Sequence, residues 1–301
     1  MKISDYLTFF RWKNLLMIVL IQLLIKFVLF QKFHLSSSLD DLHFIILILS
    51  TLFIAAAGYI INDLHDVKAD LINKPKKVFV GNKITVKETN RLFVILNSIG
   101  LLLGFYLSYH IGRNSFFIVF LIISLLLYRY SINLKKKLLI GNLIISLIVF
   151  LSIFIIVLFD LVPATNSYNR ETQLEVSNII LIYSCFAFVL TLIREIVKDL
   201  VDIEGDKKIK CKSIPIVYGT KKTKIVLVIL SITTLLSISY IAFLIYNEYT
   251  YLSYYLLLLI GLPLLYFMFI LNRSKSKEEF KKLSDLLKII MLIGIISILL
   301  I

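Results

Sequence analysis

Four polar residues in a short stretch of the sequence could bind a metal ion. Asn62, Asp63, Asp66 and Asp70 fall within nine residues. If the stretch is helical, a rotation of about 100° per residue puts all four side chains on one face. Carboxylates three or four residues apart on a helix repel one another, so a cation must offset their charge.

A second acidic stretch follows much later in the chain. It contains five carboxylates, and four of them share one face of a predicted helix, within an arc of about 60°. These four are Glu195, Asp199, Asp202 and Asp206. Glu204 points to the opposite side. A helix end at Gly205 would put Asp206 on a loop instead, because glycine commonly ends helices.

Both stretches offer only oxygen ligands, which suit Mg²⁺ or Ca²⁺ rather than zinc. The spacing is not that of an EF-hand loop. Mg²⁺ usually takes one or two carboxylates together with phosphate oxygens of a substrate. Nearby lysines do not alternate with the acids as i,i+4 partners would. Both stretches could also be solvated helix ends, but the repeated i,i+4 element favours a metal site.

The chain around these residues is 59% hydrophobic and 17% charged, whereas soluble domains carry about 25% charged residues. Its apolar runs approach or exceed the ~20 residues that cross a bilayer. We therefore predict an all-α, polytopic membrane protein, a nine-helix transmembrane bundle with cytoplasmic Asp-rich loops. The predicted spans cover residues 15–30, 43–60, 92–108, 115–128, 139–159, 178–197, 224–246, 251–271 and 283–301. No repeat or Gly/Ser-rich linker divides the chain, which predicts a single domain over residues 1–301.

The basic residues orient the predicted bundle. With the N-terminus in the cytoplasm, 29 of the 33 Lys and Arg residues lie on the cytoplasmic side. The exceptions are Lys26, Lys32, Arg113 and Arg170. This asymmetry follows the positive-inside rule and predicts a multi-pass protein of the cell membrane, with both acidic stretches facing the cytoplasm. The net charge of +14 is then explained by the orientation of the chain in the membrane and by attraction to anionic lipid headgroups. It does not indicate a nucleic-acid partner.

The acidic stretches resemble two motifs of the UbiA-type intramembrane prenyltransferases. "NDLHDVKAD" is similar to the family's Asn-Asp-x-x-Asp-x-x-x-Asp motif after its second helix, and "REIVKDLVDIEGDKKIKCKSIPIVYG" to the motif after its sixth. "YRYSINLKKKLLIGN" resembles the loop after helix four, and "RWKN" the start of helix one. Cys211 and Ser213 stand where the family usually has Gly and Thr. These departures leave the reaction class intact but blur the subfamily.

The resemblance implies Mg²⁺-dependent transfer of a prenyl group from a prenyl diphosphate. It implies that Asn62 and Asp66 bind one Mg²⁺, and that Asp202 binds another with Asp206 or Asp199. Asp63 and Asp70 would support the site, and Asp70 could orient or deprotonate the acceptor. The residues expected to carry the reaction are Asp66, Asp70 and Asp202.

The expected substrate contacts extend to basic and amide side chains. Those expected to bind diphosphate oxygens are Lys74, Arg129, Lys135 and Lys198, and each could instead be a juxtamembrane charge. Asn62 and Asp63 also belong to the expected substrate site. Arg11 and Asn14 are expected to face the acceptor. Asn142 could line the cavity or form a helix–helix hydrogen bond.

The acceptor is expected to be geranylgeranylglyceryl phosphate and the donor geranylgeranyl diphosphate. The run "REIVKDLVDIEGD" looks most like the family branch that uses this alcohol as nucleophile. The alternative acceptor is an aromatic quinone precursor, such as 4-hydroxybenzoate or dihydroxynaphthoate. A divalent-cation transporter is the alternative outside enzymes. It is less favoured because the acids lie at helix ends, whereas transport sites usually lie near the midplane.

Overall fold

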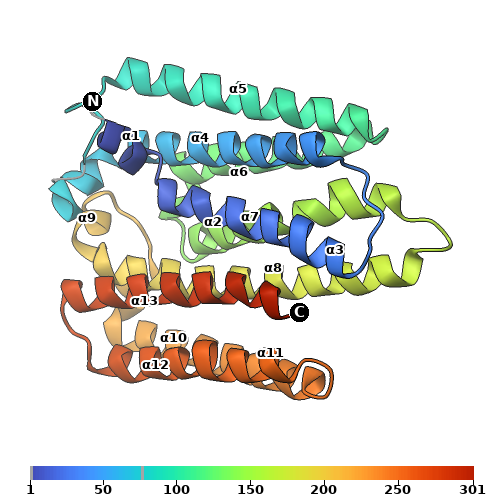
Figure 1. Ribbon diagram of the computed structural model, residues 1–301. Coiled ribbons are helices and arrows are strands. Elements are labelled where there is room, and N and C mark those ends of the chain that lie inside the picture. Colours follow the sequence, from blue (N-terminus) through green and yellow to red (C-terminus); the bar gives the residue numbers. More distant parts are fainter. Residues whose placement is uncertain (1–2, 76–77) are drawn as a thin grey trace. The chain divides into compact units, whose positions relative to one another are not determined.

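The structure is a computed structural model that describes residues 3–75 and 78–301. The described chain is helical apart from turns and one isolated bridge between Val80 and Ile84. Its helices are α1 (Ile3–Phe9), α2 (Trp12–Leu24), α3 (Phe30–Lys32), α4 (Asp41–Asn73), α5 (Val86–His110), α6 (Phe117–Ile132), α7 (Ile140–Ile156), α8 (Arg170–Val201), α9 (Ile203–Lys208), α10 (Ile214–Ile245), α11 (Thr250–Tyr255), α12 (Leu262–Arg273) and α13 (Lys277–Ile296) (Figure 1). The all-α prediction is confirmed.

Nine helical stretches within the described residues are long and apolar enough to cross a membrane. They cover Trp12–Lys32, Asp41–Asn73, Val86–His110, Asn114–Ile132, Ile140–Ala164, Arg170–Val201, Ile214–Ile245, Thr250–Arg273 and Lys277–Leu300. Each overlaps one predicted span, so the predicted number and order are confirmed. Large apolar side chains such as Phe243 and Leu102 are exposed, as lipid-facing residues would be. The protein is a multi-pass membrane protein.

The second span extends well beyond its predicted end. Helix α4 begins after Asp40, whose side chain accepts a hydrogen bond from the backbone N–H of His43 at 2.8 Å. This bond lowers the pKa of the Asp40 carboxyl. The helix continues through the first acidic motif and ends at Asn73, two residues before Pro75, because proline disfavours helical backbone in the residue before it. The motif is therefore helical, not part of a loop.

The chain forms two compact units. Unit 1 comprises Met1–Lys135 and Leu151–Ile182, and unit 2 comprises Lys136–Phe150 and Tyr183–Ile301. The chain passes between the units at three points: after Lys135, within α7 and within α8. Whether the two units are one domain, as the sequence predicts, stays a prediction.

In unit 1, α4 packs against both α5 and α6 (Figure 1). A Cβ atom at Gly100 would come within 2.6 Å of Cγ1 of Ile54, so only glycine lets α5 approach α4 this closely. Ser50 Oγ then donates a 2.7 Å hydrogen bond to the Gly100 carbonyl. This close contact fixes the helix that carries the first acidic motif.

Unit 1 also holds a buried ion pair between Lys26 and Asp160. Each lies in a π-helical segment, η1 (Ile25–Leu29) and η5 (Val157–Leu161) respectively. Lys26 Nζ lies 2.8 Å from Asp160 Oδ2 and donates to the Leu39 carbonyl at 2.6 Å. The Leu39 N–H donates to Asp160 Oδ1 at 2.8 Å. The pair therefore connects the ends of two spans to the residues that precede α4.

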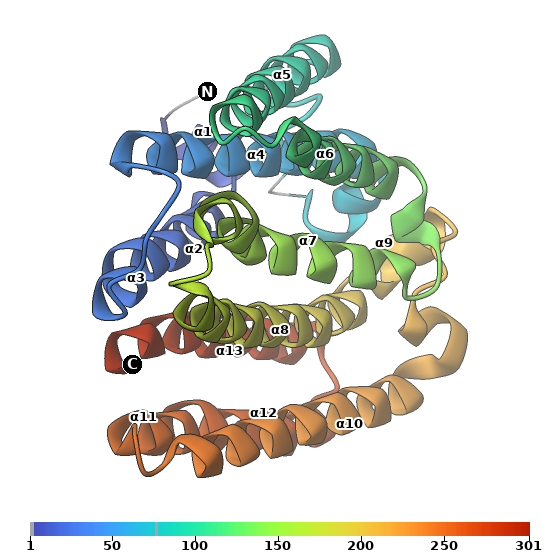
Figure 2. The same ribbon diagram turned by 90° about the vertical axis from the view of Figure 1, so that its right-hand side faces the viewer.

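The core of unit 2 forms between the second half of α8 and helices α10, α12 and α13. Leu264, Phe267 and Leu287 are fully buried there. Helix α13 starts with a capping box, in which Ser276 and Glu279 satisfy each other's backbone N–H groups. Figure 2 shows α10 running beside α11 and α12, which it contacts. This core supports the end of α8, where the second acidic motif begins.

Candidate active site

The first acidic motif lies on the last turns of α4 in unit 1. Asn62 Nδ2 donates to Asp66 Oδ2 at 2.7 Å. The other carboxylate oxygen of Asp66, Oδ1, pairs with Nζ of Lys135, which lies on a 3₁₀ turn after α6. Lys135 and Asp66 keep only 9% and 20% of their side-chain surfaces exposed. The structure thus brings together three predicted site residues.

The amide of Asn62 has an oxygen that could bind a cation. Within the described residues, its Oδ1 atom is buried and has no hydrogen-bond partner. A buried carbonyl oxygen without a partner costs free energy. This oxygen and the Asp66 carboxylate are both oxygen ligands, the kind that suits Mg²⁺. Residues 3–75 and 78–301 contain no group of three His, Cys, Asp or Glu side chains placed to hold a metal. A Mg²⁺ ion that is also bound by substrate oxygens does not need one.

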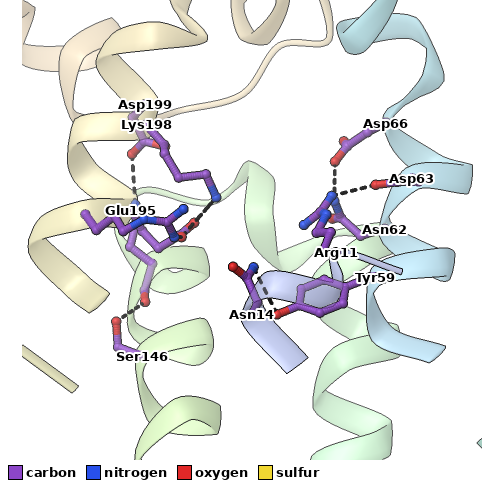
Figure 3. A network of polar contacts seen from close by, with 12 residues as sticks. Arg11, Asn14, Tyr59, Asn62, Asp63, Asp66, Ser146, Glu195, Lys198 and Asp199 are labelled. Carbon is purple, nitrogen blue, oxygen red and sulfur yellow. Dashed lines mark hydrogen bonds and ion pairs between the residues drawn. The ribbon is translucent and has the colours of Figure 1, made fainter. Parts of the chain in front are cut away.

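Arg11 connects the N-terminal segment to the same motif (Figure 3). It lies between α1 and α2 with a left-handed φ of 53°, which is uncommon for a residue other than glycine. Its Nη2 atom is 2.5 Å from Asp63 Oδ1, and its guanidinium lies 4.8 Å from the centre of the Tyr59 ring. Burial lowers the pKa of Arg11, but the Asp63 and Asp66 carboxylates outweigh it, so the pKa is above its ordinary value.

Asn14 contacts the motif helix as well, because its Nδ2 atom donates to the Tyr59 hydroxyl at 3.3 Å. Arg11 and Asn14 thus both reach Tyr59, whereas the sequence suggested that they face an acceptor. That acceptor role stays a prediction. The structure also shows what offsets the repulsion between the acids. Arg11 pairs with Asp63, and Lys135 pairs with Asp66; both cations are distant from the motif in the sequence.

The second acidic motif spans the junction of α8 and α9 in unit 2. The helix breaks at Asp202, which occupies the N-cap position of α9, not at Gly205. Asp206 lies on α9, and its N–H donates to the Asp202 carbonyl at 3.0 Å. The alternative that Asp206 lies on a loop is therefore wrong. Glycine is unfavourable within helices, but α9 continues through Gly205, whose carbonyl accepts from the Ile209 N–H at 3.3 Å.

The α8 residues of this motif are already engaged with neighbours (Figure 3). Asn142 Nδ2 on α7 donates to Asp199 Oδ2 at 2.9 Å, so Asn142 makes the helix–helix hydrogen bond that was one of its two expected roles. Lys198 Nζ lies 2.8 Å and 2.9 Å from the two Glu195 oxygens. Glu195 itself is only 8% exposed. Lys198, expected to bind diphosphate, is paired with an acid here, as Lys135 is in unit 1.

The other predicted residues lie at helix ends. Lys74 is the C-cap of α4, and its backbone N–H donates to the Asp70 carbonyl at 2.8 Å. Arg129 is exposed in the last turn of α6. Sequence reasoning missed the Lys26–Asp160 pair and the partnership of Glu195 with Lys198. A lysine inside an apolar span was the available signal for the first, since such a charge needs a partner.

The family model described as the UbiA prenyltransferase family matches residues 23–292 of this chain. A protein of Methanosphaera stadtmanae named digeranylgeranylglyceryl phosphate synthase is 31% identical over 241 residues, covering 80% of this chain and 81% of its own. A protein of Methanocaldococcus jannaschii with the same name is 30% identical over 296 residues, covering 98% and 95%.

Solved structures show the same fold. One, from a study of digeranylgeranylglyceryl phosphate synthase in membranes, is 26% identical with a TM-score of 0.59, covering 98% of this chain and 96% of its own. A UbiA homologue from Archaeoglobus fulgidus, bound to DMAPP and Mg²⁺, is 17% identical with a TM-score of 0.60, covering 99% and 100%. At 17% identity, this similarity shows only that the two chains have the same fold. With the family match over most of its length, this chain belongs to the UbiA prenyltransferase family.

Proposed function

We propose that this protein transfers a geranylgeranyl group from geranylgeranyl diphosphate to geranylgeranylglyceryl phosphate in a Mg²⁺-dependent reaction. One observation carries the proposal: the Methanocaldococcus jannaschii relative named for this product is 30% identical over 98% of this chain. The Asn62 and Asp66 oxygens, which suit a hard cation, support the metal dependence. The bound prenyl diphosphate and Mg²⁺ of the Archaeoglobus fulgidus homologue are compatible with it.

Asn62 and Asp66 would hold one Mg²⁺, and Asp202 would hold a second with Asp199 or Asp206. Bound Mg²⁺ would neutralise charge that develops on the diphosphate leaving group. The residues that would bind diphosphate oxygens as cations are Lys74, Arg129, Lys135 and Lys198. Asp63, held by Arg11, would keep the end of α4 in place.

The acceptor is an alcohol, so its hydroxyl must lose a proton as the new C–O bond forms and the allylic C–O bond to diphosphate breaks. Asp70 would orient that hydroxyl or accept its proton, because it lies one helical turn beyond Asp66 on α4. The apolar spans would shield the allylic carbon from water, which would otherwise hydrolyse the diphosphate.

An acceptor screen tests this proposal. Purified protein in detergent would be given Mg²⁺, labelled geranylgeranyl diphosphate and one acceptor at a time, with products identified by mass spectrometry. We expect digeranylgeranylglyceryl phosphate as the main product. If geranylgeranylglyceryl phosphate neither reacts nor competes while 4-hydroxybenzoate or dihydroxynaphthoate is prenylated, the quinone-precursor reading replaces ours. Mg²⁺ uptake into vesicles without any prenyl transfer would favour the transporter.

The proposed location is the cell membrane, with the active site facing the cytoplasm. The support is the distribution of charge, because 29 of 33 Lys and Arg residues lie on one side when the spans alternate. Single cysteines would be introduced at Arg113, Arg170 and Lys281 after replacement of Cys185 and Cys211. An impermeant thiol reagent added to whole cells should label the first two positions. Labelling at position 281 from outside would contradict this orientation.

A further inference from the structure

The contacts of Asp66 show that each oxygen of its carboxylate has a partner within the protein. Lys135 Nζ pairs with Oδ1, and the amide N–H of Asn62 donates to Oδ2 at 2.7 Å. Both donors present positive hydrogen atoms to oxygens that a divalent ion would need. In this arrangement Asn62 directs its nitrogen, not its oxygen, toward Asp66. A metal ion that binds this carboxylate must therefore displace at least one of these donors.

Lys135 is well placed to be an exchangeable partner. It lies on a 3₁₀ turn, η4 (Leu134–Lys136), and not within a long helix, so its ammonium can move without moving a span. Only 9% of its side chain is exposed. A buried ammonium that leaves one anion must find another, because an unpaired charge in such surroundings is costly. A bound diphosphate would supply that second anion.

We propose that Lys135 exchanges Asp66 for the diphosphate, so that the metal ion and the diphosphate bind cooperatively. The inference rests on the proposed function, because it assumes that a metal–diphosphate pair binds here. Without diphosphate, Lys135 competes with the metal for Asp66 and keeps the metal affinity low. With diphosphate present, Lys135 has a new partner, and Asp66 becomes available to the metal. Each ligand then raises the affinity for the other by the same factor.

The contrast with Lys198 supports the idea that this exchange is local to Asp66. Lys198 pairs with Glu195, one turn away on the same helix α8. This ion pair occupies no expected metal ligand directly, because Glu195 is not in the expected metal set, although the Lys198 charge also acts on neighbouring Asp199. Lys135 instead contacts the carboxylate expected to hold the metal. Lys135 is therefore the cation whose removal changes the metal affinity of the first motif.

The direct test measures Mn²⁺ binding by electron paramagnetic resonance, with detergent-purified protein and no diphosphate. The variant is Lys135→Met, which keeps side-chain length but removes the charge. The matched control is Lys136→Met, which removes the same charge one residue away, where the side chain is exposed. We expect Lys135→Met to bind Mn²⁺ on the order of tenfold more tightly than wild type, from the loss of a charge a few ångströms away. Lys136→Met should stay within about twofold. Equal affinities in the two variants would overturn the inference.

A second measurement uses the wild-type protein, in case Lys135→Met does not fold. Amine-reactive labelling read by mass spectrometry would report the reactivity of Lys135, with neighbouring Lys136 as the internal reference. Saturating Mn²⁺ alone should raise the labelling of Lys135 relative to Lys136, because the ammonium leaves Asp66. Added inorganic pyrophosphate should lower it again. Labelling of Lys135 that does not respond to Mn²⁺ would contradict the exchange.

These readouts separate the inference from the proposed function. Tighter Mn²⁺ binding by Lys135→Met, with no prenyl transfer by the wild type, would retain the Lys135–Asp66 exchange and reject the proposed reaction. Normal transfer by the wild type, with no change in Mn²⁺ affinity in the variant, would do the opposite. As a further check, the KM for geranylgeranyl diphosphate should rise in Lys135→Met, because the diphosphate loses a cation.

Discussion

Unit 1 contains two Lys–Asp pairs of low exposure that have the same charges but different surroundings. In each pair both carboxylate oxygens have partners. In the Lys26–Asp160 pair the ammonium also donates to the Leu39 carbonyl. In the Lys135–Asp66 pair, the adjacent Asn62 has a buried oxygen with no partner among the described residues. We infer that the first pair stabilises the fold and the second prepares a binding site.

Aromatic rings strengthen the difference between the pairs. The Lys26 ammonium lies 5.2 Å from the centre of the Phe44 ring and 5.5 Å from that of Phe30. Cation–π contacts of this kind stabilise a charge where water is excluded. Asp160 is fully buried, whereas Asp66 keeps 20% of its side chain exposed. A ligand can therefore reach Asp66 far more easily than Asp160.

Metal removal should give the largest difference between the two pairs, because it should abolish activity without affecting folding. We expect exhaustive chelation with EDTA to abolish prenyl transfer, because the Asp66 site would lose its ion, and added Mg²⁺ to restore it. The protein should stay folded, because Lys26 and Asp160 need no metal. Turnover and thermal unfolding would be followed in the same preparation. Full activity after chelation would contradict the metal assignment.

Loss of the buried carboxylate should have the largest effect on stability. We expect Asp160→Ala to lower the free energy of unfolding by about 3–5 kcal/mol, because it leaves Lys26 buried without its anion. Thermal unfolding in detergent would measure this loss. The fraction that remains folded should keep its turnover per molecule. A change of less than about 1 kcal/mol would show that the pair is not a structural contact.

The equivalent change at the candidate site should affect chemistry instead. We expect Asp66→Ala to reduce turnover at least about a hundredfold, or about 2.7 kcal/mol in the barrier. Asp66→Asn is the matched control, because it retains an acceptor oxygen for Lys135 but loses the charge. It should lose similar activity and lower the unfolding temperature less than Asp160→Ala does, because its amide oxygen still accepts from Lys135 and the site is less deeply buried. A large loss of stability in Asp66→Asn, with normal turnover by the fraction that stays folded, would reverse our assignment of the two pairs.

The smallest effect should come from replacing the buried pair as a unit. We expect Lys26→Met combined with Asp160→Leu to cost about 1–3 kcal/mol, less than Asp160→Ala alone. No charge is then left unpaired, but the N–H and carbonyl of Leu39 each lose a partner. A double-mutant cycle on unfolding free energies would measure the coupling. Additive single effects would mean that Lys26 and Asp160 do not act together.

The sequence predicted the spans better than their ends. Hydropathy locates the apolar centre of α4 correctly. It decreases at Asn62, so it places the end of the helix too early, because the backbone stays helical to Asn73. The residues that follow Asn62 are polar without being helix breakers, and the end comes only near Pro75. The helical face of the first motif was predictable for the same reason, since spacing along one helix needs no tertiary information.

The partners of the acidic residues could not be predicted in the same way. Lys135 was expected to bind diphosphate, but its contact with Asp66 joins residues far apart in the chain and depends on how α6 packs beside α4. Lys26 was noticed as a charge inside a span. Its partner Asp160 falls one residue past the predicted end of the fifth span, so no pattern linked them. Tertiary contacts, not local propensity, decide both pairs.

The length of α4 determines how deep in the membrane the first motif lies. At about 1.5 Å per residue, its 33 residues extend roughly 50 Å, whereas the hydrocarbon core of a bilayer is about 30 Å thick. If the apolar part starts at Asp41, Asn62 lies about 32 Å along the helix, at the far boundary of the hydrocarbon. A prenyl diphosphate has its own boundary between an oily tail and a charged head. The length of the helix thus places the first motif at the level where the diphosphate head of the substrate leaves the hydrocarbon. In a thicker membrane the carboxylates would lie closer to the hydrocarbon, where their charge is costly.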